Sequence, residues 1–163
     1  MMKIKNRFLR VVTISIACCF TTIGFSQTDK EIEETEKEGI RVSYMNYLEE
    51  QGYKPEVDED GDVTFKFEGK RYYLFVKTNR VFTLVRFLSD DDSCSERSQK
   101  AISKTSGSFY NISIHALLSC KTISFSSRSF LKEKDDWKDF FTVSLNSVKN
   151  SIESAKDFYV ENK

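Results

Sequence analysis

One run of alternating carboxylates in the sequence could bind a cation. Asp58, Asp60 and Asp62 occupy alternate positions, as the first ligands of an EF-hand calcium loop do. That loop needs a glycine at its sixth position and a bidentate glutamate at its twelfth, where this chain has Val63 and Gly69. The flanking residues also have the patterns of strands rather than helices. We therefore interpret the run as a solvated turn between strands and predict no metal site.

A second acidic run, Asp90–Asp92, precedes a segment with a helical pattern. Adjacent carboxylates rarely converge on one ion without other ligands, and no histidine or further acidic cluster is placed to help. The helix dipole favours negative charge at a helix N-terminus. Ser93 and Glu96 also match the capping box that begins many helices. The run therefore predicts the start of a helix.

The single histidine, His115, is the remaining candidate for acid–base or metal chemistry. A zinc site needs three or four ligands, and one histidine with two scattered cysteines has no recognised spacing. Abundant serines leave a Ser-His-acid triad open by composition, but no G-x-S-x-G sequence presents a nucleophile. His115 faces away from the apolar side of its predicted strand. We predict an ordinary surface histidine, and no catalytic or cofactor-binding residues.

Two cysteines, Cys94 and Cys120, follow the N-terminal segment and do not form a C-x-x-C motif. In an oxidising compartment such an isolated pair favours a disulfide. The helix after Cys94 and the strand before Cys120 run antiparallel, which brings both cysteines to the same end. The strand spans ~30 Å and the helix only ~16 Å, so the strand could overshoot. A disulfide and two buried thiols both remain open.

The N-terminus has the three parts of a secretory signal peptide. Four basic residues among the first ten precede the apolar run Val11–Phe20. The small residues Gly24 and Ser26 then stand three and one positions before Gln27. This pattern predicts that residues 1–26 are removed by cleavage between Ser26 and Gln27. We therefore expect the mature chain to be periplasmic or secreted.

Two alternatives to this cleavage have weaker support. A retained anchor would have to cross roughly 30 Å of hydrocarbon, but the segment from Val11 to Phe25 reaches only about 22 Å as a helix. A lipoprotein would be acylated at Cys18 or Cys19, and the leucine that usually stands three positions before such a cysteine is missing. We therefore expect no stable membrane span after cleavage.

Loss of residues 1–26 would leave an acidic chain. The whole chain has 25 basic and 25 acidic residues, and the first 26 residues contain four basic and no acidic ones, so 21 basic and 25 acidic residues remain, a net charge of −4. A mildly acidic surface does not attract phosphate backbones. No Lys/Arg run with interleaved aromatic residues is present either, so nucleic acid is not an expected partner.

The hydrophobic pattern predicts one α+β domain over residues 39–163, preceded by a polar segment, residues 27–38, that fits either a frayed helix or a flexible tether. Strands that come in runs, rather than alternating singly with helices, are typical of antiparallel sheets. The strands near residues 71–76 and 81–88 are apolar on both faces, which is typical of central strands covered on each side. The predicted helices are residues 36–51, 94–105 and 137–159, the last with Asp135 or Asp136 as its cap. The predicted strands are residues 53–57, 63–67, 71–76, 81–88, 110–118 and 122–127.

The segment Tyr47–Val76, YLEEQGYKPEVDEDGDVTFKFEGKRYYLFV, resembles the opening of YbjN-type domains, which share the type III secretion chaperone-like fold. The matching features are a helix ending in EEQGY, an extended KPEVD, a DEDGD turn and two strands joined at EGK. A later WKDFF before an amphipathic helix is similar as well. The resemblance implies the order α-β-β-β-α-β-β-α, with five to six antiparallel strands packed by an N-terminal helix and a long C-terminal helix.

This resemblance also implies a small, non-enzymatic scaffold that is often dimeric. The related secretion chaperones hold partner polypeptides in extended form on apolar patches, but they work in the cytosol, so this chain would be an exported version. We therefore expect an exported, non-catalytic binding module that holds a protein or peptide partner, alone or as a homodimer. The alternative is a cell-envelope sensor that binds a small ligand in a pocket under the sheet.

Overall fold

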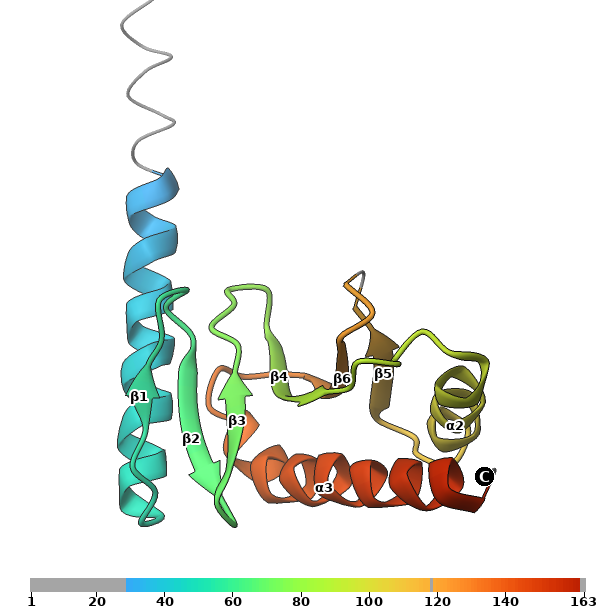
Figure 1. Cartoon of the computed structure of the whole chain (residues 1–163). Helices are drawn as coiled ribbons and strands as arrows, with labels where there is room; N and C mark the ends of the chain where they lie inside the picture. Colours follow the sequence, from blue (N-terminus) through green and yellow to red (C-terminus); the bar gives the residue numbers. More distant parts are fainter. Residues whose placement is uncertain (1–28, 118, 162–163) are drawn as a thin grey trace, which may run out of the picture. The chain divides into compact units, whose positions relative to one another are not determined.

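The computed structural model describes residues 29–117 and 119–161 (Figure 1). The predicted signal peptide, residues 1–26, therefore lies outside the described part of the chain. Of the helices that are described, none combines the length and the hydropathy needed to cross a membrane. Four residues with a predicted role in processing also fall outside the description: Cys18, Cys19, Ser26 and Gln27.

Residues 29–50 are helical, which includes every described residue of the polar segment 27–38. The helix is therefore present well before its predicted start. Lys37 explains part of this difference, because its Nζ lies 2.9 Å from a carboxylate oxygen of Glu33 and 3.0 Å from one of Glu34. Such pairs on a helix surface contribute roughly 0.2–0.5 kcal/mol each. Charge pairing thus supports helix in a stretch that has no apolar stripe.

Six strands form one antiparallel sheet in the order β1-β2-β3-β4-β6-β5 (Figure 1). The predicted α+β fold with an antiparallel sheet is confirmed. The observed order, α-β-β-β-β-α-β-β-α, adds one short strand to the order implied by the resemblance. This strand, β1, lies at the sheet edge, where Pro55 just before it removes no ladder hydrogen bond. The strands are β1 (Glu56–Val57), β2 (Val63–Phe67), β3 (Lys70–Leu74), β4 (Val81–Ser89), β5 (Ile112–Ala116) and β6 (Thr122–Phe130).

Strands β4 and β6 are interior neighbours in the sheet and pair along their whole length, from Val81 opposite Phe130 to Ser89 opposite Thr122. β6 is longer than its sequence pattern predicts, because β4 supplies a backbone partner for its polar second half. The predicted strand 110–118, in contrast, begins too early, because Tyr110 is fully exposed and lies outside β5. The ladder, and not residue alternation alone, determines where these two strands end.

The two later helices are α2 (Glu96–Ser106) and α3 (Trp137–Glu161). The N-cap of α2 is Ser95, whose hydroxyl accepts a hydrogen bond from the backbone N–H of Ser98 at 3.2 Å. The prediction of Ser93 as the cap was wrong. Ser93 is instead buried in the turn that leads from β4, where its backbone N–H donates to the carbonyl of Asp90 at 3.2 Å.

Helical residues 40–50, α2 and α3 all pack against the same face of the sheet. The ring of Trp137, at the start of α3, lies 4.6 Å from that of Tyr44 and 6.0 Å from that of Phe82 on β4, centroid to centroid. Alternate residues of the strands point into this core, as their period of two requires. The most completely buried core residues are Leu48, Val63, Phe65, Tyr72, Leu74, Phe82, Leu84, Phe125, Trp137, Val148 and Ile152.

The opposite, outer face of the sheet has no helix over it in the part of the chain that is described. This differs from the expectation that the apolar strands β3 and β4 are covered on both sides. Val85 on this face is still only 3% exposed. It lies opposite Tyr73 of β3, and the ring of Tyr73 packs edge-on against Phe87 of β4 at 5.2 Å. Neighbouring aromatic side chains therefore take the place of a second layer.

Candidate functional site

The acidic run at residues 58–62 forms the turn between β1 and β2. Oδ1 of Asp58 accepts hydrogen bonds from the backbone N–H groups of Asp60 and Asp62, at 3.0 and 2.9 Å. Oδ1 of Asp62 in turn accepts one from the backbone N–H of Val76, at 2.7 Å. These carboxylates satisfy backbone donors rather than surrounding an ion. Among the described residues, no group of three or more Asp, Glu, His or Cys side chains could hold a metal.

Asp62 gives a testable pH dependence. Burial raises the pKa of this carboxyl, although the Val76 N–H acts in the opposite direction. Because the folded state binds this proton more tightly than the unfolded state, the contribution of Asp62 to stability decreases as the pH rises through its pKa. Asp62→Asn keeps an acceptor for Val76 and should retain wild-type stability at pH 7, whereas Asp62→Ala should lose about 1 kcal/mol in urea unfolding.

The Asn variant should also lose the part of the acid pH dependence of stability that comes from the raised pKa of this carboxyl. Equal losses for the Asn and Ala variants at pH 7 would show that the charge, and not the acceptor oxygen, stabilises the turn.

His115 lies exposed on the outer face of β5. The neighbouring serine hydroxyls are used by the backbone: Ser124 donates to the His115 carbonyl at 3.4 Å, and Ser126 donates to the Ser113 carbonyl at 3.3 Å. These hydroxyls therefore bond to main-chain oxygens rather than to the imidazole. The geometry of a nucleophile activated by a base is not formed by these side chains.

Cys94 and Cys120 are joined by a disulfide, with Cα atoms 5.1 Å apart. The sequence left this question open because a long strand could have overshot the helix. Strand β5 ends at Ala116, and a turn then brings Cys120 back toward the start of α2. The backbone N–H of Asp90 also donates to the carbonyl of Lys121 at 2.9 Å. The turn before α2 is thus tied to the start of β6 at two points.

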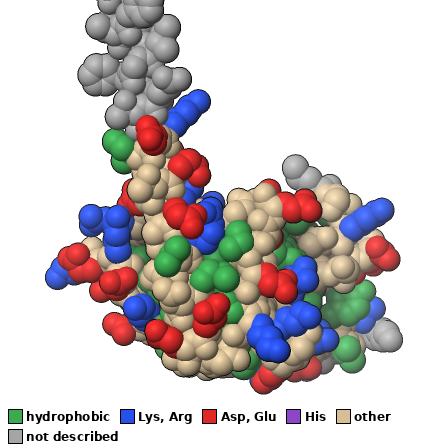
Figure 2. Space-filling view, turned by 90° about the vertical axis from the view of Figure 1, so that its left-hand side faces the viewer, with side chains coloured by type: hydrophobic (Ala, Val, Ile, Leu, Met, Phe, Trp, Pro, Cys, Tyr) green, Lys and Arg blue, Asp and Glu red, His purple; other side chains and the backbone are tan. Residues whose placement is uncertain are grey.

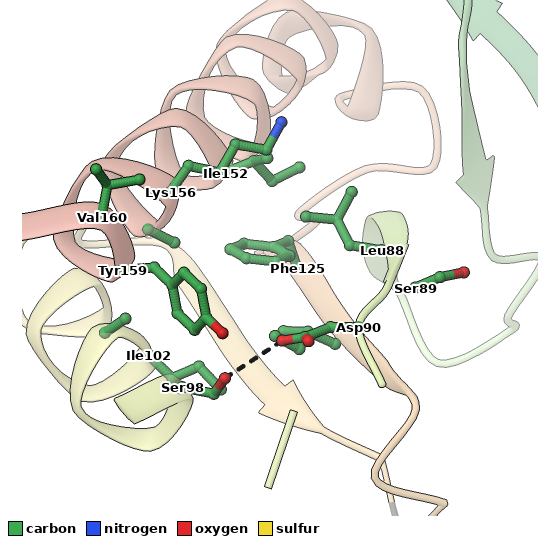
Figure 3. A pocket seen from close by; sticks show the side chains of 13 residues that line it. Leu88, Ser89, Asp90, Ser98, Ile102, Phe125, Ile152, Lys156, Tyr159 and Val160 are labelled. Carbon is green, nitrogen blue, oxygen red and sulfur yellow. Dashed lines mark hydrogen bonds between the residues drawn. The ribbon is translucent and has the colours of Figure 1, made fainter. Parts of the chain in front are cut away.

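A pocket of about 370 Å³ lies between α2, the C-terminal half of α3, and strands β4 and β6 (Figure 3). We call it the α2–α3 pocket. It exists because the facing helices carry small side chains at Ser98, Ala101 and Ala155, which leave space over the sheet. The remaining lining is mainly apolar and comprises Leu88, Ser89, Asp90, Ile102, Ile123, Phe125, Ile152, Lys156, Tyr159 and Val160.

Polar groups gather at one end of the α2–α3 pocket. Oδ2 of Asp90 accepts a hydrogen bond from the Ser98 hydroxyl at 3.3 Å, and Oδ1 accepts one from the backbone N–H of Asp92 at 3.1 Å. The hydroxyl of Tyr159 is directed toward the same end, whereas the ammonium of Lys156 points away from Asp90 (Figure 3). The pocket therefore has an apolar body and a hydrogen-bonding end.

Contacts between α2 and the end of α3 hold Tyr159 in place. The guanidinium of Arg97 lies 4.0 Å above the Tyr159 ring and donates from Nε to the Tyr159 carbonyl at 2.8 Å. Lys104 lies 4.1 Å above the ring of Phe158. Two cations thus approach the C-terminal turn of α3, where unpaired carbonyls and the helix dipole favour positive charge. Arg97 and Lys104, which do not line the pocket, therefore hold the end of α3 that forms one of its walls.

The sequence offered a pocket under the sheet as an alternative but predicted neither the position nor the lining of this one. Its lining comes from four elements that are far apart along the chain. One signal was present, because α2 offers little apolar surface apart from Ala101 and Ile102. A helix this poor in large apolar residues cannot fill the space between itself, a long helix and a sheet.

On the face seen in Figure 2, basic and acidic side chains are intermingled, and hydrophobic side chains appear in small groups between them. No continuous basic surface is visible in this view. Exposed large apolar residues also occur on the outer face of the sheet, where Phe130 is 87% and Phe87 is 36% exposed. The α2–α3 pocket and this outer sheet face both have the character of binding sites.

No protein-family model, curated protein or solved structure matches the chain. The resemblance of Tyr47–Val76 to YbjN-type domains therefore stays a prediction. A function has to be argued from the geometry of the chain's own surfaces, because a fold by itself does not specify one.

Proposed function

We propose that the chain is an exported, non-catalytic binding module whose α2–α3 pocket takes up a small molecule with an apolar body. The pocket itself carries this proposal. Its volume of about 370 Å³ falls within the range of natural ligand sites, roughly 300–1,000 Å³. Like such sites, it has a mainly apolar lining with a few polar groups at one end. This function corresponds to the sensor alternative from the sequence.

Two features support export. Residues 1–26 have the sequence pattern of a signal peptide. The Cys94–Cys120 disulfide is of the kind that persists in oxidising compartments and is rare in the cytosol of mesophiles. The proposed location is therefore the periplasm or the medium outside the cell.

The hydrogen bonds that the candidate catalytic side chains already make support a role without catalysis. The carboxylates of Asp58 and Asp62 accept hydrogen bonds from backbone N–H groups. Among the residues that line the pocket, Asp90 has the one carboxylate. The Ser98 hydroxyl donates to the Asp90 carboxylate in a partly buried contact of 3.3 Å. General acid–base chemistry usually needs a second positioned group with a matched pKa. The pocket is better suited to holding a molecule than to converting it.

Blocking the pocket tests the proposal. Ala155→Phe places a ring where the pocket lies, so it should weaken binding of the neutral probe N-phenyl-1-naphthylamine about tenfold or more. Probe fluorescence, which rises in apolar surroundings, measures the affinity. The matched control is Val143→Phe, which adds a similar ring to the exposed side of α3, where Val143 is 60% exposed.

Circular dichroism would establish that both variants are folded. Equal probe binding by the Ala155→Phe and Val143→Phe proteins, or no probe binding by the unaltered chain, would contradict the pocket as the binding site.

A second candidate function is the holding of a protein or peptide partner, including a second copy of the chain, on the outer face of the sheet. The Tyr73–Phe87 ring pair and the exposed Phe130 favour it, because an uncovered aromatic surface on central strands is the type of patch that marks interaction sites. The resemblance to YbjN-type domains agrees with this function. Partner capture that survives Ala155→Phe but fails with Phe87→Ser would favour it over the pocket.

A further inference from the structure

We infer that the α2–α3 pocket selects molecules whose apolar body carries a protonated amine, and that Asp90 receives the amine. This inference rests on the proposed function and adds to it the chemistry of the ligand. It follows from the charge at the polar end of the pocket, from the groups that already bind Asp90, and from the position of the other charged residues nearby.

Asp90 is the one acidic residue that lines the pocket, and its side chain is half-buried. Its described partners are the Ser98 hydroxyl and the Asp92 backbone N–H, both neutral donors. No ion pair between Asp90 and a lysine or arginine occurs in the described ranges. A carboxylate has about four acceptor positions, so two remain for a ligand. A ligand ammonium would supply the missing opposite charge through charge-assisted hydrogen bonds.

The other charged groups near the pocket do not favour an anionic ligand. The guanidinium of Arg97 is engaged by the ring and carbonyl of Tyr159. Lys156 is exposed, and its ammonium is directed away from Asp90 (Figure 3). An ion pair at such an exposed position contributes little because water and salt screen it. A carboxylate placed at the polar end would instead meet the negative charge of Asp90.

The apolar part of the pocket limits the size of the ligand body. Phe125 and Ile123 of β6, together with Ile102 of α2 and Ile152 of α3, line the apolar body of the pocket. A volume of about 370 Å³ lies near the lower end of the range of natural ligand sites and suits a compact aromatic or alkyl body. The inferred ligand class is therefore a small aralkyl or alkyl amine rather than a polyamine or a sugar.

Three compounds with the same phenyl body and different head groups test this inference. The full chain, exported into the periplasm of a bacterial host so that the disulfide forms, would be titrated at pH 7 with phenethylamine, 2-phenylethanol and 3-phenylpropanoate, and binding followed by NMR. We expect phenethylamine to bind about tenfold more tightly than 3-phenylpropanoate, with the alcohol between them. Asp90→Asn, which keeps an acceptor for the Asp92 N–H, should lower the affinity for phenethylamine about tenfold and leave the affinity for 2-phenylethanol unchanged.

Lys156→Gln is the control, because Lys156 is the other charged residue that lines the pocket. This variant should still bind the amine most tightly, the alcohol less tightly and the carboxylate least tightly. Equal affinities for the three compounds, or amine binding that Asp90→Asn does not weaken, would overturn the amine inference while leaving the proposed function intact. Absence of binding by all three would overturn the amine inference, and absence of N-phenyl-1-naphthylamine binding as well would overturn the proposed function. If Asp90→Asn does not fold, the order of affinities in the unaltered chain decides the question.

Discussion

Replacing Trp137 by alanine is expected to lower the free energy of unfolding by about 3–5 kcal/mol, the usual cost of removing a large buried aromatic side chain. Trp137 is 2% exposed and begins α3. Its ring packs edge-on against Tyr44 at 4.6 Å and Tyr47 at 4.9 Å, and stacks on Phe82 at 6.0 Å. The ring therefore joins the first helix, the last helix and the central strand β4.

Urea unfolding followed by circular dichroism at 222 nm would measure this loss, because the variant lacks the one tryptophan of the chain. Phe130→Ala is the matched control. It also removes an aromatic ring, but Phe130 is 87% exposed, and the expected change is within about 0.5 kcal/mol. Similar losses for the two variants would mean that Trp137 is not central to the core.

Removing the Cys94–Cys120 disulfide by a double substitution to serine is expected to cost about 3.5 kcal/mol. The sequence separation of the two cysteines is 26 residues. In the chain-entropy description, a crosslink that closes a loop of this size lowers the entropy of the unfolded chain and thereby destabilises the unfolded state by about 3.5 kcal/mol. For a domain of this size the midpoint of thermal unfolding should fall by roughly 10 °C. Calorimetry of the double variant and of the unaltered chain would measure both quantities.

The same substitution should weaken ligand binding in the α2–α3 pocket. Without the disulfide, the turn that carries Asp90 is held to β6 mainly by the hydrogen bond from the Asp90 N–H to the Lys121 carbonyl. Phenethylamine affinity should therefore fall in the double variant. A reducing agent should affect the unaltered chain in the same way and leave the double variant unchanged. Unaltered stability and affinity after reduction would exclude a structural role for the disulfide.

The elements that could be predicted from the sequence are those with a regular pattern of burial. An apolar stripe with steps of three and four residues predicts α3, and it consists of Trp137, Phe141, Leu145, Val148, Ile152, Ala155 and Tyr159. Its members Phe141, Leu145, Val148 and Ile152 are buried in the core. The alternation of Val63, Phe65 and Phe67 likewise predicts β2. In both cases the residues that must leave water are spaced at the period of the element itself.

Element ends were harder to predict because partners distant in sequence determine them. The polar residues at the end of β6 remain in strand conformation because β4 pairs with them. The cap of α2 is Ser95 rather than Ser93, next to a turn that the disulfide ties to Cys120, at a sequence separation of 26 residues from Cys94. No pattern within ten residues of these positions reports such contacts.

By itself, the sequence determined the α+β class, the antiparallel sheet and the buried face of the long last helix, since local periodicity decides which side of each element leaves water. Only the tertiary structure decided that helical residues 40–50, α2 and α3 all cover one face, that Cys94 meets Cys120, and that Asp90, Ser98 and Tyr159 share one pocket. The physical reason is that a pocket is the space that side chains from separate elements fail to fill. That space depends on how these elements pack, and no single segment of the chain encodes it.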